Sequence, residues 1–360
     1  MAFRPDDPED LALRLRDMYV AAEGRILQQL ARSMARTMDA PDWLTARLAE
    51  QRRMIRAVDA ILDDLFEDVP GAVERLTALS FNRGAGIAST DAAAAGISMD
   101  LVGRARNTAT DVVLARAATE PLQRMRLQVR RWTDDVYART GLLAAQQVAS
   151  GASTRRDASL RFLQQLGGRG VTGFTDRAGR AWEMGAYAEM VGRTTVAQAQ
   201  LEGHAERLED LGVDTVIVSN APEECNICRP FEGQVLSLRG RTTGRLSDGR
   251  TVMTTLGRAK SAGLFHPNCR HSYSIYLPGI TKGPARDKAD PEGQKLRERQ
   301  RAYERRIRAL KREELIAAAI DPEAGKVAGR KVRAKQAEFK AFRDEHGRKA
   351  QTHRTNITAR

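Results

Sequence analysis

CNIC at residues 225–228 and HPNCRH at residues 266–271 contain all three cysteines of this 360-residue chain and two of its five histidines. In the first stretch, the two-residue gap between Cys225 and Cys228 allows both thiolates to reach one tetrahedral ion from a tight turn. A lone pair of this kind also occurs in redox proteins and as buried thiols. The second stretch favours a metal, because it adds further soft ligands to a chain with no other cysteine.

In the second stretch, His266 and Cys269 repeat the same spacing. Together with the two CNIC cysteines they form a Cys3His set, which is a complete tetrahedral zinc shell. His271 lies two positions after Cys269 and is an alternative to His266 as the fourth ligand. We therefore predict a zinc site that uses four of the five residues, and the sequence leaves the choice between the two histidines open.

The residues around these motifs predict a small α+β lobe over residues 166–283. The best strand is the β-branched run DTVIVSN at 214–220, and two shorter strands are expected at 234–238 and 272–276. Residues 240–263 are polar and predict a long loop or hairpin. Four protein ligands would close the shell of a zinc ion, whereas catalytic zinc keeps an open position. A structural ion would supply folding free energy to a lobe that has little core of its own.

Before the lobe, apolar residues at steps of three and four predict helices throughout residues 1–165. The first helix starts near Pro8, and its apolar stripe consists of Leu11, Leu15, Met18, Ala22, Ile26 and Leu30. A second starts at Asp42, with a stripe formed by Leu44, Leu48, Ile55, Val58, Leu62 and Leu65. Residues 71–103 are rich in Ala and Gly and predict either a loosely packed helix pair or a connector. Helical periodicity returns over 104–147, and Gly151 is expected to end that helix.

The lobe itself is expected to open with two local elements. FTDRAGRAW at residues 174–182 predicts a short hairpin, and a helix follows from Met184 to about Leu211. The expected fold class is thus mainly α, with a helical N-terminal region, a zinc-knuckle-like α+β lobe and a helical tail.

The tail, residues 284–360, is helical and basic, with a break at Asp321-Pro322. From Lys282 to Arg360 there are 23 basic and 12 acidic residues, so this segment carries +11 of the formal net charge of +13. Such a tail favours sequence-independent binding to DNA phosphates. The candidate contacts are Arg299, Arg301, Arg305, Arg306, Arg308, Lys311 and Arg312. The alternative is a helical face on which Glu and Asp pair with Arg at helical spacing.

No apolar run approaches the roughly 20 residues that cross a bilayer, so we expect no membrane partner. The N-terminal stretch MAFRPDDPED is acidic and lacks the apolar segment of a secretory signal. We therefore expect an intracellular start in a reducing compartment, where the cysteines remain thiols or bind metal.

Enzymatic interpretations have weaker support in the sequence. His204 and Glu206 before a CxxC are similar to the motif pair of zinc nucleobase deaminases, but Pro222 lies too early and HPNCRH would have no role. A nuclease with His271 as general base lacks an acidic pair to hold a catalytic ion. The sequence contains no recognisable set of nucleophile, base and orienting residue, so it does not indicate a protease. We therefore expect no enzyme, and the main enzymatic alternative is a metal-assisted nuclease. A sequence-independent DNA-binding protein is the other alternative function.

Four motifs occur in an order that resembles a known family. They are FTDRAGRAWEMGAYAEMVGRTTVAQA at 174–199, VDTVIVSNAPEECNICRPFEGQV at 213–235, LFHPNCRHSYSIYLPG at 264–279 and RQRAYERRIRALKR at 299–312. Together they resemble the minor capsid protein 2 family of tailed phages and, more distantly, phage head morphogenesis proteins.

This resemblance implies a structural role in a phage or prophage particle. The expected partners are the portal protein and capsid or scaffold proteins, and double-stranded DNA could be bound non-specifically by the tail. The implied location is the virion, at the capsid interior or the portal vertex, after assembly in the cytoplasm of the bacterial host. The metal-type residues of the family map onto Cys225, Cys228, His266, Cys269 and His271.

Overall fold

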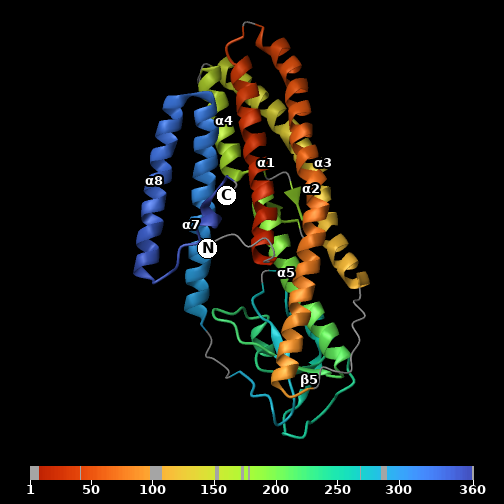
Figure 1. Cartoon of the computed structure of the whole chain (residues 1–360). Coiled ribbons are helices and arrows are strands. Elements are labelled where there is room, and N and C mark those ends of the chain that lie inside the picture. Colours follow the sequence, from red (N-terminus) through yellow and green to blue (C-terminus); the bar gives the residue numbers. More distant parts are fainter. Residues whose placement is uncertain are drawn as a thin grey trace. The chain divides into compact units, whose positions relative to one another are not determined.

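Figure 1 shows the computed structural model of the chain, in which residues 8–40, 42–97, 108–150, 154–171, 174–176, 179–267, 269–284 and 290–358 are described. The helices are α1 (Pro8–Thr37), α2 (Trp43–Ala94), α3 (Thr108–Ala149), α4 (Arg155–Arg169), α5 (Met184–Asp210), α6 (Leu256–Ser261), α7 (Pro291–Ile320) and α8 (Pro322–Glu345). The strands are β1 (Phe174–Thr175), β2 (Ala181–Trp182), β3 (Thr215–Val218), β4 (Val235–Ser237), β5 (Val252–Thr255) and β6 (Tyr273–Ile275). The predicted class, mainly α with a small α+β part, is confirmed.

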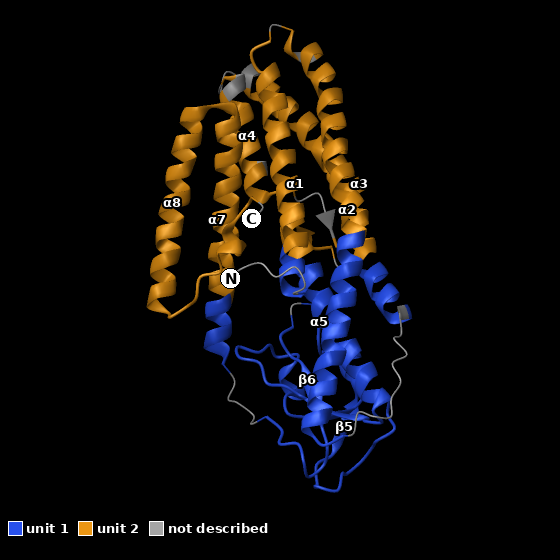
Figure 2. Cartoon of the chain, in the orientation of Figure 1, with its two compact units in different colours: residues 1–13, 71–118, 190–297 blue, residues 14–70, 119–189, 298–360 orange. Residues whose placement is uncertain are grey.

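The chain divides into two compact units, each built from separate stretches of sequence (Figure 2). We call residues 1–13, 71–118 and 190–297 the sheet unit, because it contains strands β3 to β6. Residues 14–70, 119–189 and 298–360 form the helical unit. Long helices such as α2 contribute residues to both units. The division into 1–165, 166–283 and 284–360 therefore stays a prediction about which segments fold independently.

In the helical unit, apolar faces of α1, α2 and α3 supply much of the core. Ile26, Leu30 and Met34 of α1 are fully buried, as are Val58 and Leu62 of α2. Helix α3 adds Val136, Thr140 and Ala144, which are buried on one of its faces. The expected end of that helix at Gly151 lies outside the described residues.

One residue of the α2 stripe was predicted wrongly. The side chain of Leu48 is 60% exposed instead of buried. At this level of α2 the inward positions are taken by Arg47, which lies over the Tyr137 ring, and by Glu50, which pairs with Arg36. Arg47 and Glu50, which have partners inside the protein, thus occupy the inward positions, and Leu48 faces outward.

The tail forms a helical hairpin, and its break occurs where the sequence predicted. The Asp321 side chain accepts a hydrogen bond from the Glu323 backbone N–H, and Pro322 occupies the first turn of α8. Across the hairpin, the Tyr303 ring stacks on Phe339 at 5.5 Å between ring centroids. Figure 1 shows α7 and α8 side by side. The aromatic ring of Tyr303 on α7 therefore packs against α8.

In the sheet unit, α2 continues beyond Pro70 to Ala94, through most of the Ala- and Gly-rich stretch expected to be a helix pair or connector. A Cβ atom added at Gly84 would lie 2.0 Å from the Gln200 carbonyl oxygen, and one at Gly203 would lie 2.1 Å from the Phe81 carbonyl oxygen. The backbones of α2 and α5 thus meet without side chains between them. The small residues that weaken the helical pattern are needed for this close crossing. The last residues of the Ala- and Gly-rich stretch, 98–103, lie outside the described part of the chain.

The sheet has the strand order β5-β4-β3-β6. Strand β3 pairs antiparallel with β4 and β6, while β4 pairs in parallel with β5. All three predicted strands are present, at β3, β4 and β6. Apolar residues from one face of the sheet pack with α5 and the end of α2 in one hydrophobic cluster that includes Val216, Leu236, Ile275, Leu201, Leu208 and Ala92.

The predicted polar loop at 240–263 contains two regular elements, β5 and α6. Strand β5 is only partly buried and carries two threonines and an exposed methionine, so it lacks the apolar run that marks β3. Helix α6 is short, and the Thr255 side chain caps it by accepting a hydrogen bond from the Arg258 backbone N–H. The hairpin expected around 174–182 is present as the antiparallel pair β1 and β2. In the described part of the chain no helix combines the length and apolarity needed to cross a membrane.

Candidate metal centre

The sheet brings the two cysteine motifs together. CNIC follows β3, and HPNCRH precedes β6. Because β3 and β6 are paired antiparallel, the end of β3 and the start of β6 lie side by side, and both loops lie at that end of the strand pair. Just beyond the strands, the Ser219 backbone N–H donates to the Ser272 carbonyl oxygen, and the Ser272 N–H donates to Ser219 Oγ. This pairing holds the two motifs against one another, although Cys225 and His266 are 41 positions apart in sequence.

The five predicted ligands form two overlapping groups of donor atoms. Cys225, Cys228 and His266 have donor atoms within 4.8 Å of one another, and the same holds for Cys228, Cys269 and His271. Cys228 belongs to both groups and is buried. These residues are therefore placed so that they could hold a metal ion, as the sequence predicted.

Individual distances support this geometry. The distance from Cys228 Sγ to Cys269 Sγ is 3.5 Å, and from Cys269 Sγ to His271 Nδ1 it is 3.4 Å. Zinc bonds of about 2.3 Å to sulfur and about 2.1 Å to nitrogen give tetrahedral edges of about 3.8 Å between two sulfurs and about 3.6 Å between a sulfur and a nitrogen. The separations of these two pairs are close to these edges, so Cys228, Cys269 and His271 are placed as three ligands of one tetrahedral ion, while Cys225 belongs to the other group.

Contacts within the cluster shift the pKa values of its three thiols. A hydrogen bond from the Cys228 thiol lowers the pKa of Cys269 to about 4, although burial acts in the opposite direction. The same contact, together with burial, raises the pKa of Cys228. Burial alone would raise the pKa of Cys225, but a hydrogen bond with His266 helps to lower it to about 7. Thiolate formation is thus already favoured at two of the three sulfurs, and metal ligation needs thiolates.

A residue that the sequence analysis missed lies beside the cluster. Glu232 follows the 3-10 turn Arg229–Phe231 and is almost fully buried. One of its oxygens lies 2.8 Å from His271 Nε2 and accepts a hydrogen bond of 3.1 Å from the Ala221 backbone N–H. No spacing rule singles out this glutamate, because it lies in neither motif and its neighbour His271 is 39 positions away.

The seven basic residues predicted to bind DNA do not share one surface. Arg299, Arg305 and Arg306 are exposed, while Arg301 and Lys311 are partly buried. Arg301 pairs with Glu304 and Arg306 with Glu313, so part of the tail follows the alternative of ion pairs at helical spacing. The remaining two, Arg308 and Arg312, face the interior of the helical unit.

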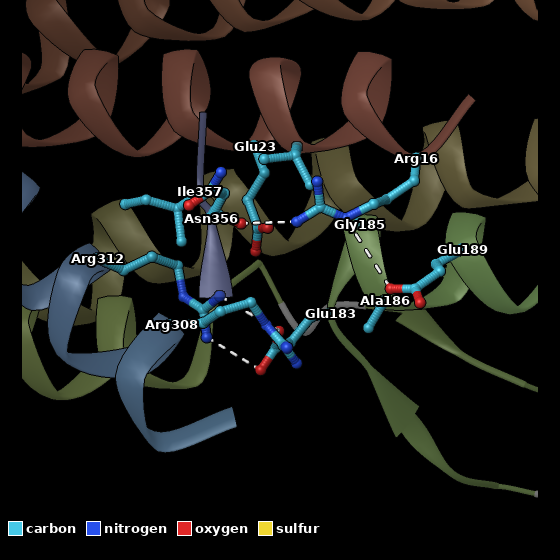
Figure 3. A pocket seen from close by; sticks show the side chains of 11 residues that line it. Arg16, Glu23, Glu183, Gly185, Ala186, Glu189, Arg308, Arg312, Asn356 and Ile357 are labelled. Carbon is cyan, nitrogen blue, oxygen red and sulfur yellow. Dashed lines mark hydrogen bonds and ion pairs between the residues drawn. The ribbon is translucent and has the colours of Figure 1, made fainter. Parts of the chain in front are cut away.

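Arg308 and Arg312 belong to a buried network that we call the arginine–glutamate network: Arg16, Glu23, Glu183, Glu189, Arg308 and Arg312. They line one small pocket, which Figure 3 shows from close by. Both Arg308 and Arg312 pair with Glu183, and Arg312 also donates to the backbone carbonyls of Gly167 and Gly168. The Arg312 side chain is only 2% exposed. The expectation that this arginine binds DNA is therefore corrected: its charge is balanced inside the protein.

Comparison with known proteins adds the identity of the family. A family model described as phage minor capsid protein 2 matches residues 3–344. The chain belongs to the phage minor capsid protein 2 family. The match includes both cysteine motifs, the helices around them and most of the tail, so the resemblance predicted from four motifs is confirmed.

A more distant relative agrees with this assignment. A protein described as a structural protein of Lactococcus phage LL-H is 24% identical over 168 residues. The alignment covers 46% of this chain and 45% of the relative, so the chain spans less than half of that protein's length. No solved structure matches the chain.

Proposed function

We propose that this phage minor capsid protein is a non-enzymatic component of the phage head that acts with the portal protein and the capsid shell or its scaffold. The observation that carries the proposal is the family match over nearly the whole chain. The implied location is the virion, either in the capsid interior or at the portal vertex. The protein would be added during head morphogenesis in the cytoplasm of the bacterial host.

Co-expression with the portal and capsid proteins of the same phage tests this role. We expect the chain to sediment with heads on a density gradient and to copurify with tagged portal protein at moderate salt. A chain that stays in the soluble fraction while complete heads form without it would contradict the proposal. Heads made with and without the portal protein then distinguish the portal vertex from the shell.

The metal centre is proposed to bind one structural zinc ion. Three thiolates and one imidazole match the ligand preference of zinc and leave no open coordination position for a substrate. The bound ion would cross-link the loop after β3 to the loop before β6 and so stabilise the pairing of these two strands. Elemental analysis of the purified full chain tests this: about one zinc per chain is expected, and no zinc after expression in zinc-supplemented medium would contradict it.

Contact with packaged DNA is proposed for the exposed part of α7, around Arg299, Arg305 and Arg306. These side chains are accessible, and the tail has a large positive charge. Phosphate contacts release counterions, so each contact contributes about −0.9 to the slope of log K against log salt. Binding in the capsid would then need no sequence recognition.

Salt-dependent binding of a short duplex checks this proposal. Replacing Arg299, Arg305 and Arg306 by alanine should weaken binding and reduce the salt slope by up to about 3. The matched control replaces three exposed arginines of α3, Arg124, Arg126 and Arg131, and should leave the slope unchanged. Equal losses in the two variants would indicate a diffuse charge effect and contradict a DNA-binding surface on α7.

The nuclease alternative is tested in the same preparation. In the described part of the chain, both groups of donors close enough to hold an ion consist of cysteines and histidines, and His271 already contacts Glu232 and Cys269. We expect plasmid DNA to remain intact with added Mg²⁺ or Mn²⁺. Metal-dependent cleavage that His271→Ala abolishes would contradict the non-enzymatic role.

A further inference from the structure

The buried carboxylate of Glu232 has no role in the metal centre as the sequence describes it. Its side chain is 2% exposed, and that of His271 is 3% exposed. A buried carboxylate is costly unless it is paired or hydrogen-bonded. Here it accepts two hydrogen bonds, from the Ala221 backbone N–H and from the His271 ring. The same carboxylate therefore connects the loop after β3 to the loop before β6.

The hydrogen bond to Glu232 determines which nitrogen of His271 is available. Because an ionised carboxylate can only accept a hydrogen bond, this contact selects the tautomer of His271 with its proton on Nε2, and the lone pair of the neutral ring then lies on Nδ1. That atom is 3.4 Å from Cys269 Sγ, close to the tetrahedral edge of about 3.6 Å between a sulfur and a nitrogen ligand of one zinc ion. Metal-bound histidines commonly donate their other N–H to a carboxylate in this way.

His266 is less buried than His271, and its Nδ1 contacts a backbone carbonyl oxygen, that of its neighbour Pro267, at 2.9 Å. Such a carbonyl can also orient a metal-bound ring, so the contrast between the two histidines rests on burial and on the distance to sulfur. Its Nε2 lies 3.1 Å from Cys225 Sγ, which is clearly shorter than the edge of about 3.6 Å and in the range of a hydrogen bond to sulfur. The residue before it, Phe265, has a φ of 62°, so the turn that presents His266 uses a backbone conformation rare for this residue type.

We propose that the metal is bound by Cys225, Cys228, Cys269 and His271, and that Glu232 is the positioning residue that orients the His271 ring. His266 lies outside the ligand shell and interacts with the Cys225 sulfur. This inference rests on the proposed zinc centre and chooses between the two histidines that the sequence left open. The sheet supports the choice, since the residue next to His271, Ser272, is hydrogen-bonded to Ser219 at the end of β3.

X-ray absorption at the zinc edge on the full-length protein tests the ligand set. The wild type should show three sulfur ligands and one nitrogen ligand. In His266→Ala this shell should be unchanged, whereas in His271→Ala the nitrogen should be replaced by oxygen or lost. Because the ligand shell of His266→Ala is informative by itself, the test survives if His271→Ala fails to fold. Loss of the nitrogen in His266→Ala, or two nitrogen ligands in the wild type, would overturn the proposal.

Zinc affinity, measured by competition with a chromophoric chelator, tests Glu232. We expect Glu232→Gln to bind zinc about 10- to 100-fold more weakly with the same ligand shell, because the amide is a poorer acceptor for the imidazole N–H. Glu209→Gln is the matched control, since Glu209 lies in the sheet unit but pairs with Arg239. Equal affinities of Glu232→Gln and wild type would overturn the positioning role.

The outcomes separate this inference from the proposed zinc centre. If the wild type binds no zinc, the zinc centre itself fails and the ligand assignment fails with it. If the wild type binds one zinc but the nitrogen ligand is His266, only the present inference fails. Zinc binding with the predicted response of both histidine variants supports both.

Discussion

The sheet unit and the helical unit join distant parts of the chain by different chemistry. In the sheet unit, three thiols and two imidazoles from two loops converge beside a four-stranded sheet. In the helical unit, the buried side chain of Arg312 connects α7 to Glu183 and to the backbone at the end of α4. One unit concentrates soft metal ligands, and the other concentrates buried charge.

The difference shows that a basic tail need not be a binding surface along its whole length. A buried ion pair gains little over apolar packing, but removing one of its members leaves an uncompensated charge. Arg308 and Arg312 therefore stabilise the fold through their ion pairs with Glu183. The side chains of Arg299, Arg305 and Arg306 are exposed to solvent. A metal site differs from such an ion pair, because a chelator can remove the metal ion without any mutation.

Loss of a ligand of the proposed zinc site is the change expected to separate the two units most clearly. Cys228→Ser changes the residue that belongs to both donor groups, and we expect loss of zinc and unfolding around the sheet. Structural zinc contributes about 10–16 kcal/mol in zinc-finger peptides, so this should be the largest effect. Zinc content and hydrogen exchange of the β3 and β6 amides measure it.

Two controls accompany that variant. Ile227→Ser changes an exposed residue of the same turn and should keep the zinc. Trp43, Trp132 and Trp182 are the three tryptophans of the chain and all belong to the helical unit, so tryptophan fluorescence should report an unchanged unfolding transition. A shift of that transition as large as the loss in the sheet would show that the two units do not unfold separately.

Arg312→Ala is the corresponding change in the helical unit. It removes the more deeply buried of the two arginines that pair with Glu183, and we expect a loss of about 3–5 kcal/mol in the free energy of unfolding. Urea unfolding followed by tryptophan fluorescence measures the loss. Arg305→Ala, on an exposed position of the same helix, should change stability by less than about 0.5 kcal/mol. Similar stabilities of the two variants would contradict a structural role of Arg312.

Two glutamates of the arginine–glutamate network should respond to pH in opposite ways. Burial acts to raise the pKa of Glu183, but Arg312 and Arg308 bring it below its usual 4.5. Its stabilisation is therefore present above about pH 4.5 and is lost as the pH falls. Burial raises the pKa of Glu23, so this carboxyl stabilises the fold in its protonated form, and its contribution is lost as the pH rises.

The isosteric substitutions test this contrast. At pH 7, Glu183→Gln should cost about 1.5–3 kcal/mol through weakened charged hydrogen bonds, and the cost should shrink below pH 4. Glu23→Gln should cost less, because burial favours the protonated carboxyl, which the amide resembles. Urea unfolding of both variants and wild type between pH 3 and pH 8 measures the difference. Parallel pH profiles for the two variants would contradict the assigned directions.

The smallest effect concerns the crossing of α2 and α5 in the sheet unit. Gly84→Ala would place a methyl group 2.0 Å from the Gln200 carbonyl oxygen, so we expect a loss of about 1–3 kcal/mol. Gly86→Ala, on the same helix with open space at its Cβ, should instead stabilise by up to about 1 kcal/mol. Hydrogen exchange of the α5 amides is the measurement, and equal signs for the two variants would contradict the close crossing.

Much of the fold could be predicted from local pattern. The three strands at β3, β4 and β6, the α5 helix and the break at Asp321 all have signals within a few residues of themselves. Strand β5 has no such signal, because at the edge of a sheet a half-exposed VMTT segment looks like a loop. The Ala- and Gly-rich part of α2 looked irregular because its partner, the α5 backbone, is far away in sequence.

The sequence by itself determined that five soft ligands lie in two short motifs, because ligand spacing within a turn is a local property. Only the tertiary structure decided what surrounds them. Glu232 is 39 positions from His271, and Glu183 is 129 positions from Arg312. The charge state and accessibility of a side chain depend on such neighbours in space. The sequence can therefore name a candidate ligand or a basic residue, but the fold decides which histidine is oriented and which arginine is exposed.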